Sequence, residues 1–218
     1  QQPLSLPAEQ LKRRVFDLSI EAWERYTRRL DTLPSAWLST AKRMRGDMVC
    51  ADTVSGGLSG WRFITGVIII SRFIRRLCRE QHVGLLLPTS NGGAIANMAA
   101  LMCGKTIVNL NYTASVEATQ AALAKAGIRT VFTSTRFLDR LEKRGIDGRA
   151  LVAGATVYPL EDFQPKISQV RRVTTLLQAV LLPAWLLKLL YLKRVPLESP
   201  AAILFSSGSE GVPKGVML

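Results

Sequence analysis

An alternation of short apolar runs with helix-forming segments constrains this chain more than any other feature of its sequence. The run at 83–87 is followed by a Pro/Gly turn and then by a small-residue segment with helical character at 94–103. The same order of strand, turn and helix then repeats. Because strands joined by a helix lie parallel in one sheet, this order predicts an α/β fold made of right-handed β-α-β units. The expected strands are 83–87, 106–109, 130–133, 155–158 and 201–205, and the expected helices between them include 94–103 and 115–126.

A charged helical pattern precedes this repeating region. Apolar residues recur at helical spacing through 9–30, and Pro34 closes the segment. Such a pattern is typical of the last helix of a preceding domain. We therefore expect two parts, with 1–34 as the tail of a preceding domain or a linker and 35–218 as the main unit.

A second helix is expected directly before the first strand. Segment 61–80 carries Phe63, Val67 and Ile74 at helical spacing, so one face of it should pack on a core. The Gly- and Ser-rich segment 53–60 predicts a turn ahead of this helix.

The charge of the chain favours an anionic partner. Its 29 Lys and Arg residues against 16 Asp and Glu residues give a formal net charge of +13. A nucleic acid, an anionic membrane surface or a polyphosphate would complement this charge. Because the basic residues are spread along the chain without zinc-finger spacing or an aromatic RNA-binding signature, we expect no nucleic acid partner.

The cysteines and the single histidine indicate no metal centre. Cys50, Cys78 and Cys103 stand far apart, and only His82 could add a nitrogen ligand. We interpret the cysteines as buried free thiols in a reducing compartment. His82 lies at the start of an apolar run, so we interpret it as a strand-edge or surface histidine without catalytic chemistry.

The segment 173–192 is apolar over about the length that a bilayer requires. Pro183 interrupts its middle, and basic residues flank both of its ends, namely Arg171, Arg172, Lys193 and Arg194. We favour an interfacial helix held by anionic lipids, with a buried helix and a membrane span as the alternatives.

The segment that follows the last expected strand suits a triphosphate. Glycines allow a backbone to approach an anion, serine hydroxyls donate hydrogen bonds to phosphate oxygens, and Lys214 supplies a positive charge. It is not a Walker loop, because Pro213 stands where that loop has its second Gly and Gly follows Lys214. The candidate nucleotide-binding residues are Ser206, Ser207, Gly208, Ser209, Glu210, Gly211, Lys214 and Gly215.

This segment resembles the Thr/Ser-Ser-Gly-Thr/Ser-x-Gly-x-Pro-Lys-Gly signature of the adenylate-forming superfamily, which includes acyl-CoA synthetases and luciferases. Segments 84–91, 99–104 and 109–112 agree with that family in order and spacing. Within the superfamily, 207–211, 109–114 and 132–134 look most like a bacterial bifunctional type. That type joins an acyl-[acyl-carrier-protein] synthetase to a 2-acylglycerophosphoethanolamine acyltransferase. The likeness covers about 58–218, and 3–30 resembles the end of the acyltransferase domain.

The resemblance implies a fold, a reaction and partners. Residues 35–218 would form the N-terminal part of the adenylation domain, ending after the phosphate loop. ATP with Mg²⁺ would be bound there, and Lys214 would be catalytic, neutralising charge on the departing pyrophosphate. Glu210 departs from the Thr common in the superfamily and needs a partner, for which a magnesium ion and a downstream Arg are both candidates. The implied partners are a fatty acid, an acyl-carrier protein, a lysophospholipid and an anionic membrane surface, at the cytoplasmic face of the bacterial inner membrane.

The resemblance also places several required residues outside this sequence. The family's aromatic-Gly-x-Thr-Glu segment, ribose-binding Asp and C-terminal catalytic Lys would follow Leu218, and the acyltransferase His-x4-Asp pair would precede Gln1. We therefore expect an internal segment of a longer polypeptide that is inactive alone.

Two other functions remain open. One is a fatty-acyl-CoA synthetase without an acyltransferase domain, and the other is a non-enzymatic basic membrane-binding module whose Ser/Gly loop is only a turn. Stabilisation by ATP with magnesium would separate the enzymes from the module.

Overall fold

The computed structural model describes residues 7–27, 30–206 and 214–218, and the chain divides into two compact units, Gln1–Thr32 and Leu33–Leu218. The first unit consists of helix α1 (Ala8–Thr27), which lies within about three residues of the helix predicted at 9–30. Its apolar side chains, among them Phe16 and Trp23, are exposed.

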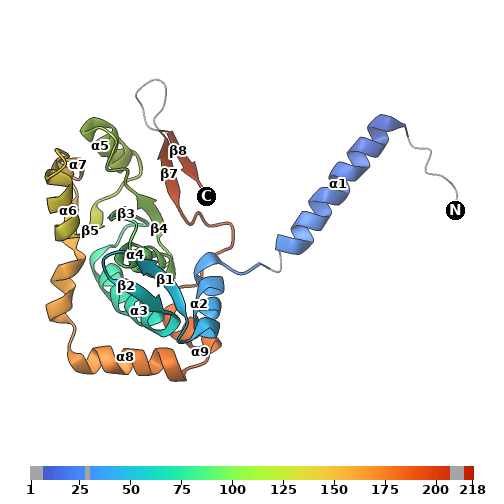
Figure 1. Ribbon diagram of the computed structural model, residues 1–218. Coiled ribbons are helices and arrows are strands. Elements are labelled where there is room, and N and C mark those ends of the chain that lie inside the picture. The colour runs from blue at the N-terminus through green and yellow to red at the C-terminus, as the bar shows by residue number, and fades with distance from the viewer. Residues whose placement is uncertain (1–6, 28–29, 207–213) are drawn as a thin grey trace. The chain divides into compact units, whose positions relative to one another are not determined.

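A four-stranded parallel sheet forms the centre of the second unit (Figure 1). The strands are β3 (His82–Leu86), β4 (Thr106–Asn109), β5 (Thr130–Thr133) and β6 (Thr156–Pro159), in the order β4-β3-β5-β6. All of its ladders are parallel, so the predicted α/β fold of β-α-β units is confirmed.

Helices cover both faces of this sheet, because successive strand residues point in opposite directions. Leu85 belongs to one core with α2 (Leu33–Met44), α3 (Gly60–Leu77) and α4 (Asn91–Met102). Its neighbour Leu86 belongs to a second core with α5 (Val116–Lys125), α6 (Thr135–Glu142) and α7 (Gly148–Leu151).

Serine residues begin the helices that follow the strands. The hydroxyl oxygens of Ser90, Ser115 and Ser134 each accept a hydrogen bond from the backbone N–H three residues later, in α4, α5 and α6 respectively. Such caps satisfy backbone groups that the first helical turn leaves unpaired. They fix where α4, α5 and α6 begin.

Helix α3 is the most central helix of this unit, and it packs against α2, α4 and α8. The predicted amphipathic pattern is confirmed, since Phe63, Val67 and Ile74 are all buried. The turn predicted at 53–60 was partly wrong, because the chain forms a hairpin of β1 (Met48–Asp52) and β2 (Gly56–Ser59) there.

After β6 the chain forms the 3₁₀ helix η1 (Leu160–Lys166), then α8 (Gln169–Leu181) and α9 (Ala184–Tyr191). Pro183 separates α8 from α9, so the apolar stretch 173–192 is two short helices. In the part of the chain that the structure describes, no helix is both long and apolar enough to cross a bilayer.

The fifth expected strand needed correction. Strand β7 (Ile203–Ser206) pairs antiparallel with β8 (Lys214–Met217) and joins the parallel sheet only through one bridge between Ile107 and Ala202. The antiparallel partner β8 was not predicted.

Candidate functional site

The β7–β8 hairpin stands at the carboxyl edge of the parallel sheet, beside β4. Ile107 donates its backbone N–H to Ala201 at 3.0 Å, and the Thr106 hydroxyl donates to the carbonyl of Pro200 at 2.9 Å. Because the bridge between Ile107 and Ala202 is parallel, β7 runs in the direction of β4 and ends at the same edge of the sheet. Ligands of open α/β sheets bind at this edge.

Pairing within the hairpin brings the two ends of the predicted phosphate loop together. Ser206 lies opposite Lys214, and Phe205 lies opposite Gly215. Hydrogen bonds between Ala202 and Leu218 close the base of the hairpin. The hairpin therefore holds Ser206 and Lys214 side by side. Of the predicted nucleotide-binding residues, Ser207, Gly208, Ser209, Glu210 and Gly211 lie outside the described residues.

Gly215 fits closely against the hairpin's own side chains. A Cβ atom at this position would lie 3.1 Å from Cε1 of Phe205 and 3.2 Å from Cγ2 of Ile203. Both distances are shorter than ordinary van der Waals contact. Gly215 therefore leaves room for the side chains of Phe205 and Ile203 where β8 pairs with β7.

A hollow of about 580 Å³ opens beside the carboxyl ends of β3 and β4. The side chain of Asn109, at the end of β4, donates a hydrogen bond of 3.0 Å to Asn97 on α4, and Asn97 donates one of 2.9 Å to the carbonyl of Gly93. The hollow therefore combines amide groups with apolar walls, which is typical of small-molecule sites. Its lining residues are Cys50, Ala51, Leu87, Pro88, Thr89, Ser90, Gly93, Ala94, Asn97 and Asn109.

Asp52 fixes the wall of this hollow. Its carboxylate accepts hydrogen bonds from the backbone N–H groups of Ser55, Asn91 and Val54 and from the Ser55 hydroxyl. The N–H of Ser55 contributes most to holding the pKa of Asp52 well below its ordinary value. The β1–β2 hairpin is thereby tied to the start of α4. Sequence reasoning missed Asp52, although the spacing Asp-x-x-Ser is typical of an Asx turn.

A second carboxylate orders the end of β5. The Ser134 hydroxyl donates to Glu161 Oε1 at 2.6 Å, and the Thr135 N–H donates to Oε2 at 3.2 Å. Partial burial acts to raise the pKa of Glu161, but these hydrogen bonds outweigh it and hold the pKa below the ordinary value. Glu161 is thus a fixed anion that links η1 to the start of α6.

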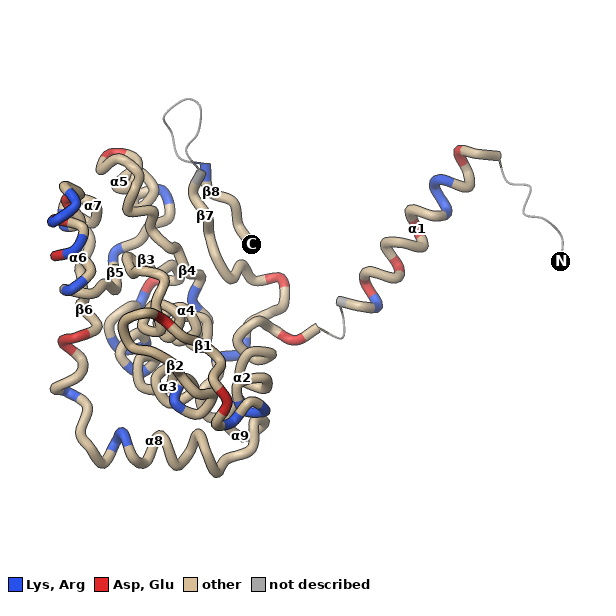
Figure 2. The backbone as a smooth tube through the Cα atoms, viewed as in Figure 1, with Lys and Arg blue, Asp and Glu red and all other residues tan. Residues whose placement is uncertain are grey.

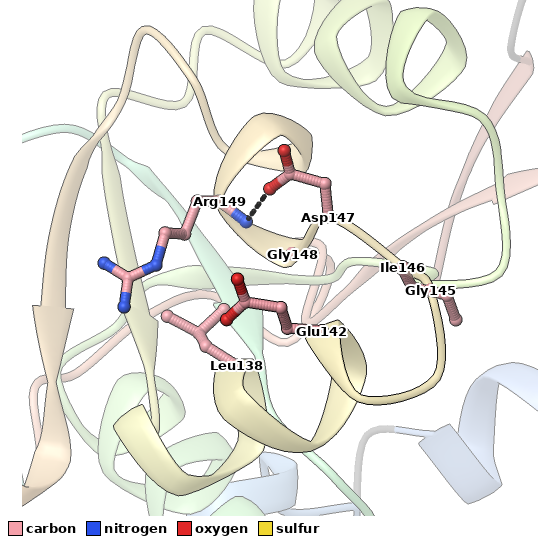
Figure 3. A pocket seen from close by; sticks show the side chains of 7 residues that line it. All are labelled: Leu138, Glu142, Gly145, Ile146, Asp147, Gly148 and Arg149. Atoms are coloured by element: carbon pink, nitrogen blue, oxygen red, sulfur yellow. Dashed lines mark hydrogen bonds between the residues drawn. The ribbon is translucent and has the colours of Figure 1, made fainter.

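A smaller hollow of about 380 Å³ lies between α6 and α7 (Figure 3). Asp147 uses its carboxylate to cap α7, accepting from the N–H groups of Arg149 at 3.0 Å and Ala150 at 2.9 Å. Glu142 and the guanidinium of Arg149 complete its charged lining (Figure 3). Because the carboxylate of Asp147 caps α7, we interpret this hollow as the junction between α6 and α7 and not as a binding site.

The cysteines and the histidine show no sign of catalytic chemistry. Cys78 and Cys103 are buried free thiols, as predicted, whereas Cys50 is only half-buried. Burial, followed by the charge of Glu80, raises the pKa of Cys78 to about 11, so its thiol is a poor nucleophile. His82 begins β3, and its Nδ1 lies 2.7 Å from the carbonyl oxygen of Ala126.

Comparison with protein families gives one match. A family model described as AMP-binding enzyme matches residues 70–218, which is more than half of the chain. The matched segment includes the parallel sheet and the whole β7–β8 hairpin.

Solved structures share the fold of this chain. VinN is 17% identical, over 87% of this chain and 44% of that chain, with a TM-score of 0.61. The nonribosomal peptide synthetase FmoA3, in an AMPPNP-bound form, is 20% identical over 86% of this chain and 17% of its own, with a TM-score of 0.60. O-succinylbenzoate coenzyme A synthetase (MenE) from Bacillus subtilis, in complex with AMP, is 13% identical over 83% of this chain and 41% of its own, with a TM-score of 0.54. The chain thus spans less than half the length of each.

Proposed function

This chain belongs to the AMP-binding enzyme family of the adenylate-forming superfamily, and on that premise we propose that it forms part of an enzyme that activates a fatty acid with ATP. The fatty acid carboxylate would attack the α-phosphorus, and pyrophosphate would leave. The observation that carries this proposal is the hairpin at the carboxyl edge of the sheet, with Ser206 and Lys214 paired across the ends of the signature loop.

The loop residues have the chemistry that a departing pyrophosphate needs. Ser206, Ser207 and Ser209 supply hydroxyl donors, and Gly208 and Gly211 have no side chain to block an approaching phosphate. Lys214, which is exposed at the start of β8, would stabilise the charge that builds up as pyrophosphate leaves.

Magnesium enters this proposal as a companion of ATP. Within 7–27, 30–206 and 214–218, no group of His, Cys, Asp and Glu is arranged to hold a metal ion. Mg²⁺ commonly binds through substrate phosphates with one or two carboxylates. Glu210, in the signature loop, is the carboxylate of this chain that we propose to lie near the phosphates.

We further propose which molecule accepts the activated acyl group and which reaction follows. Segments 207–211, 109–114 and 132–134 support acyl transfer to an acyl-carrier protein, linked to reacylation of a lysophospholipid at the cytoplasmic face of the inner membrane. Residues 1–34 would then close an acyltransferase domain, and 35–218 would begin the adenylation domain. A fatty-acyl-CoA synthetase uses the same first step, so the acceptor distinguishes the two.

Two assays on the full-length protein test the proposal. Fatty-acid-dependent exchange of pyrophosphate into ATP is expected, and its absence with all chain lengths would contradict acyl activation. Acyl-carrier protein and coenzyme A are then compared as acceptors of the activated acyl group. Thioester formation with acyl-carrier protein is expected, and transfer to coenzyme A alone would favour the synthetase without an acyltransferase.

A further inference from the structure

Helices α8 and α9 present an uncovered apolar surface on the outer edge of the second unit (Figure 1). On α8 the exposed residues Val170, Val173, Leu177 and Leu181 recur at intervals of three and four, so they lie on one face. Leu181 is 72% exposed. On α9, beyond Pro183, the exposed residues Trp185 and Leu189 lie four apart and so share a face of that helix. We call the exposed apolar residues of α8 and α9 the elbow surface.

The opposite faces of both helices hold the elbow in place. Thr175, Ala179 and Leu187 are fully buried, and α8 packs on α3 while α9 packs on α2. Lys42 of α2 donates to the last carbonyl groups of α8, at 2.7 Å to Ala179 and 2.6 Å to Val180. The exposed apolar side chains are therefore not needed for packing within this unit.

Side-chain hydrogen bonds fix the angle between the two helices. The Tyr191 hydroxyl donates to Gln178 Oε1 at 2.6 Å, joining the end of α9 to α8. Arg75 of α3 donates to the carbonyl of Tyr191 at 3.1 Å. The elbow surface is thus presented by a rigid support, so little ordering would be needed on binding.

The charged residues of the segment that carries the elbow surface have one sign. Between Asp162 and Glu198 the sequence contains no acidic residue (Figure 2). The basic residues of that interval are Lys166, Arg171, Arg172, Lys188, Lys193 and Arg194. Exposed apolar residues, a Trp among them, on a segment whose charged residues are all cationic fit the boundary of an anionic bilayer.

A basic hollow of about 540 Å³ adjoins the end of α9. It combines cationic side chains from α3, the segment between α3 and β3, the turn before β4 and the segment after α9 with the apolar side chains of Leu190 and Leu192. Two of the cations are partly engaged, since Arg75 donates to Tyr191 and Lys105 donates to the carbonyl groups of Arg79 and Glu80. The four basic residues that line it are Arg75, Arg79, Lys105 and Lys193.

We propose that the elbow surface lies in the headgroup layer of an anionic membrane, with its apolar side chains among the acyl chains and the basic hollow facing lipid phosphates. An apolar protein partner would not require the cations of this segment and of the basic hollow, whereas an anionic lipid surface is complementary to both features. The inference deepens the proposed membrane association, and it does not depend on adenylation. It would bring the enzyme to the place where fatty acids and lysophospholipids are found.

Vesicle co-sedimentation of the full chain without ATP tests this proposal. The probe is vesicles of equal parts phosphatidylglycerol and phosphatidylcholine, compared with phosphatidylcholine alone. Binding to the anionic vesicles is expected and should weaken as salt is raised. Replacing Arg171, Arg172, Lys193 and Arg194 with Gln should lower the partition coefficient at least about tenfold, since each cation adds to the attraction. Replacing Arg136, Arg140, Lys143 and Arg144, which lie in α6 and directly after it, removes the same charge. This control should change the partition coefficient much less.

The apolar contribution has its own matched pair. Val173, Leu177, Leu181 and Trp185 are replaced with Ser, and the same residue types on α1 serve as the control, namely Leu11, Val15, Leu18 and Trp23. The elbow variant should lose vesicle binding while its circular dichroism spectrum and Tm are retained. Unchanged binding in the elbow variants, or equal loss in the α1 control, would overturn the proposal. The proposal would also be overturned if the wild-type chain did not bind vesicles but self-associated through the elbow surface. Because the assay contains no ATP, any of these failures leaves the proposed acyl activation standing.

Discussion

Two adjacent glycines show how single atoms position the carboxyl edge of the sheet. A Cβ at Gly93 would lie 2.5 Å from the carbonyl oxygen of Pro88, whereas a Cβ at Gly92 would meet only Ser90 Oγ at 3.8 Å. Gly93 therefore lets α4 start directly against the loop that ends β3. Gly92 has no such role, although it occupies the same first turn.

Gly93→Ala is expected to lower the free energy of unfolding by about 1–3 kcal/mol, the usual cost of forcing a group into a packed site. Gly92→Ala should change it little or raise it by up to about 1 kcal/mol, because Ala favours a helix. Urea unfolding of both variants measures the difference. Equal stabilities would show that α4 does not press on Pro88.

Asp52 gives a pH dependence to stability. Its pKa is held below the ordinary value by hydrogen bonds that exist only in the folded chain, led by the N–H of Ser55. Such a group stabilises the fold above its unfolded pKa of about 4, and the contribution is lost as pH falls below that value.

Asp52→Asn should therefore lower Tm at pH 7, and the gap from wild type should narrow as the buffer is taken below about pH 4. Thermal unfolding followed by circular dichroism across this range tests the prediction. Asp139→Asn, on the exposed face of α6, is the matched control. A gap that stays constant with pH would mean that the carboxylate charge is not what ties β1–β2 to α4.

At the scale of elements, helix α9 has one face that packs on the core and another that is exposed. Leu187 is fully buried, and Leu189, two residues later, is 61% exposed. Leu187→Ala should lower the free energy of unfolding by about 2–5 kcal/mol, and Leu189→Ala should change it by less than about 0.5 kcal/mol. Chemical denaturation compares them directly. If Leu189→Ala were the more damaging change, the assignment of faces on α9, and with it the elbow surface, would be wrong.

Elements with strong local patterns could be predicted from the sequence. The strands at 106–109 and 130–133 have the predicted bounds, because buried parallel strands are short runs of apolar and β-branched residues between turns. The signature motif likewise predicted the AMP-binding family, which the family match at 70–218 confirms, while its role in holding phosphates stays a prediction.

Elements that depend on context were missed. Pro34 was read as closing a helix, but it stands in the first turn of α2, where its missing N–H costs nothing. The β1–β2 hairpin has two glycines in β2 and no clear alternation, so no strand was expected. The antiparallel partner of β7 was missed because strand pairing depends on contacts that a local pattern does not record.

At the scale of the whole molecule, the net charge of +13 has two separate uses in this account. One is the single cation at the phosphate loop, Lys214, and the other is the group of cations around the elbow surface. We propose that the first acts in the chemistry and the second in binding to the membrane. The two can therefore be removed independently, which makes the functional claim testable without disturbing the membrane claim.

The most direct test of the central claim is Lys214→Ala in the full-length protein, assayed in both proposed half-reactions. Pyrophosphate leaves with more negative charge than ATP carries at the same oxygen, so the lysine should stabilise the transition state more than bound ATP. Adenylation should fall by roughly 10²-fold or more, with a smaller loss of ATP affinity. Acyl transfer to lysophospholipid from ready-made acyl-carrier protein should be retained, as should both reactions in the control Lys143→Ala. Unchanged adenylation in Lys214→Ala would contradict the account.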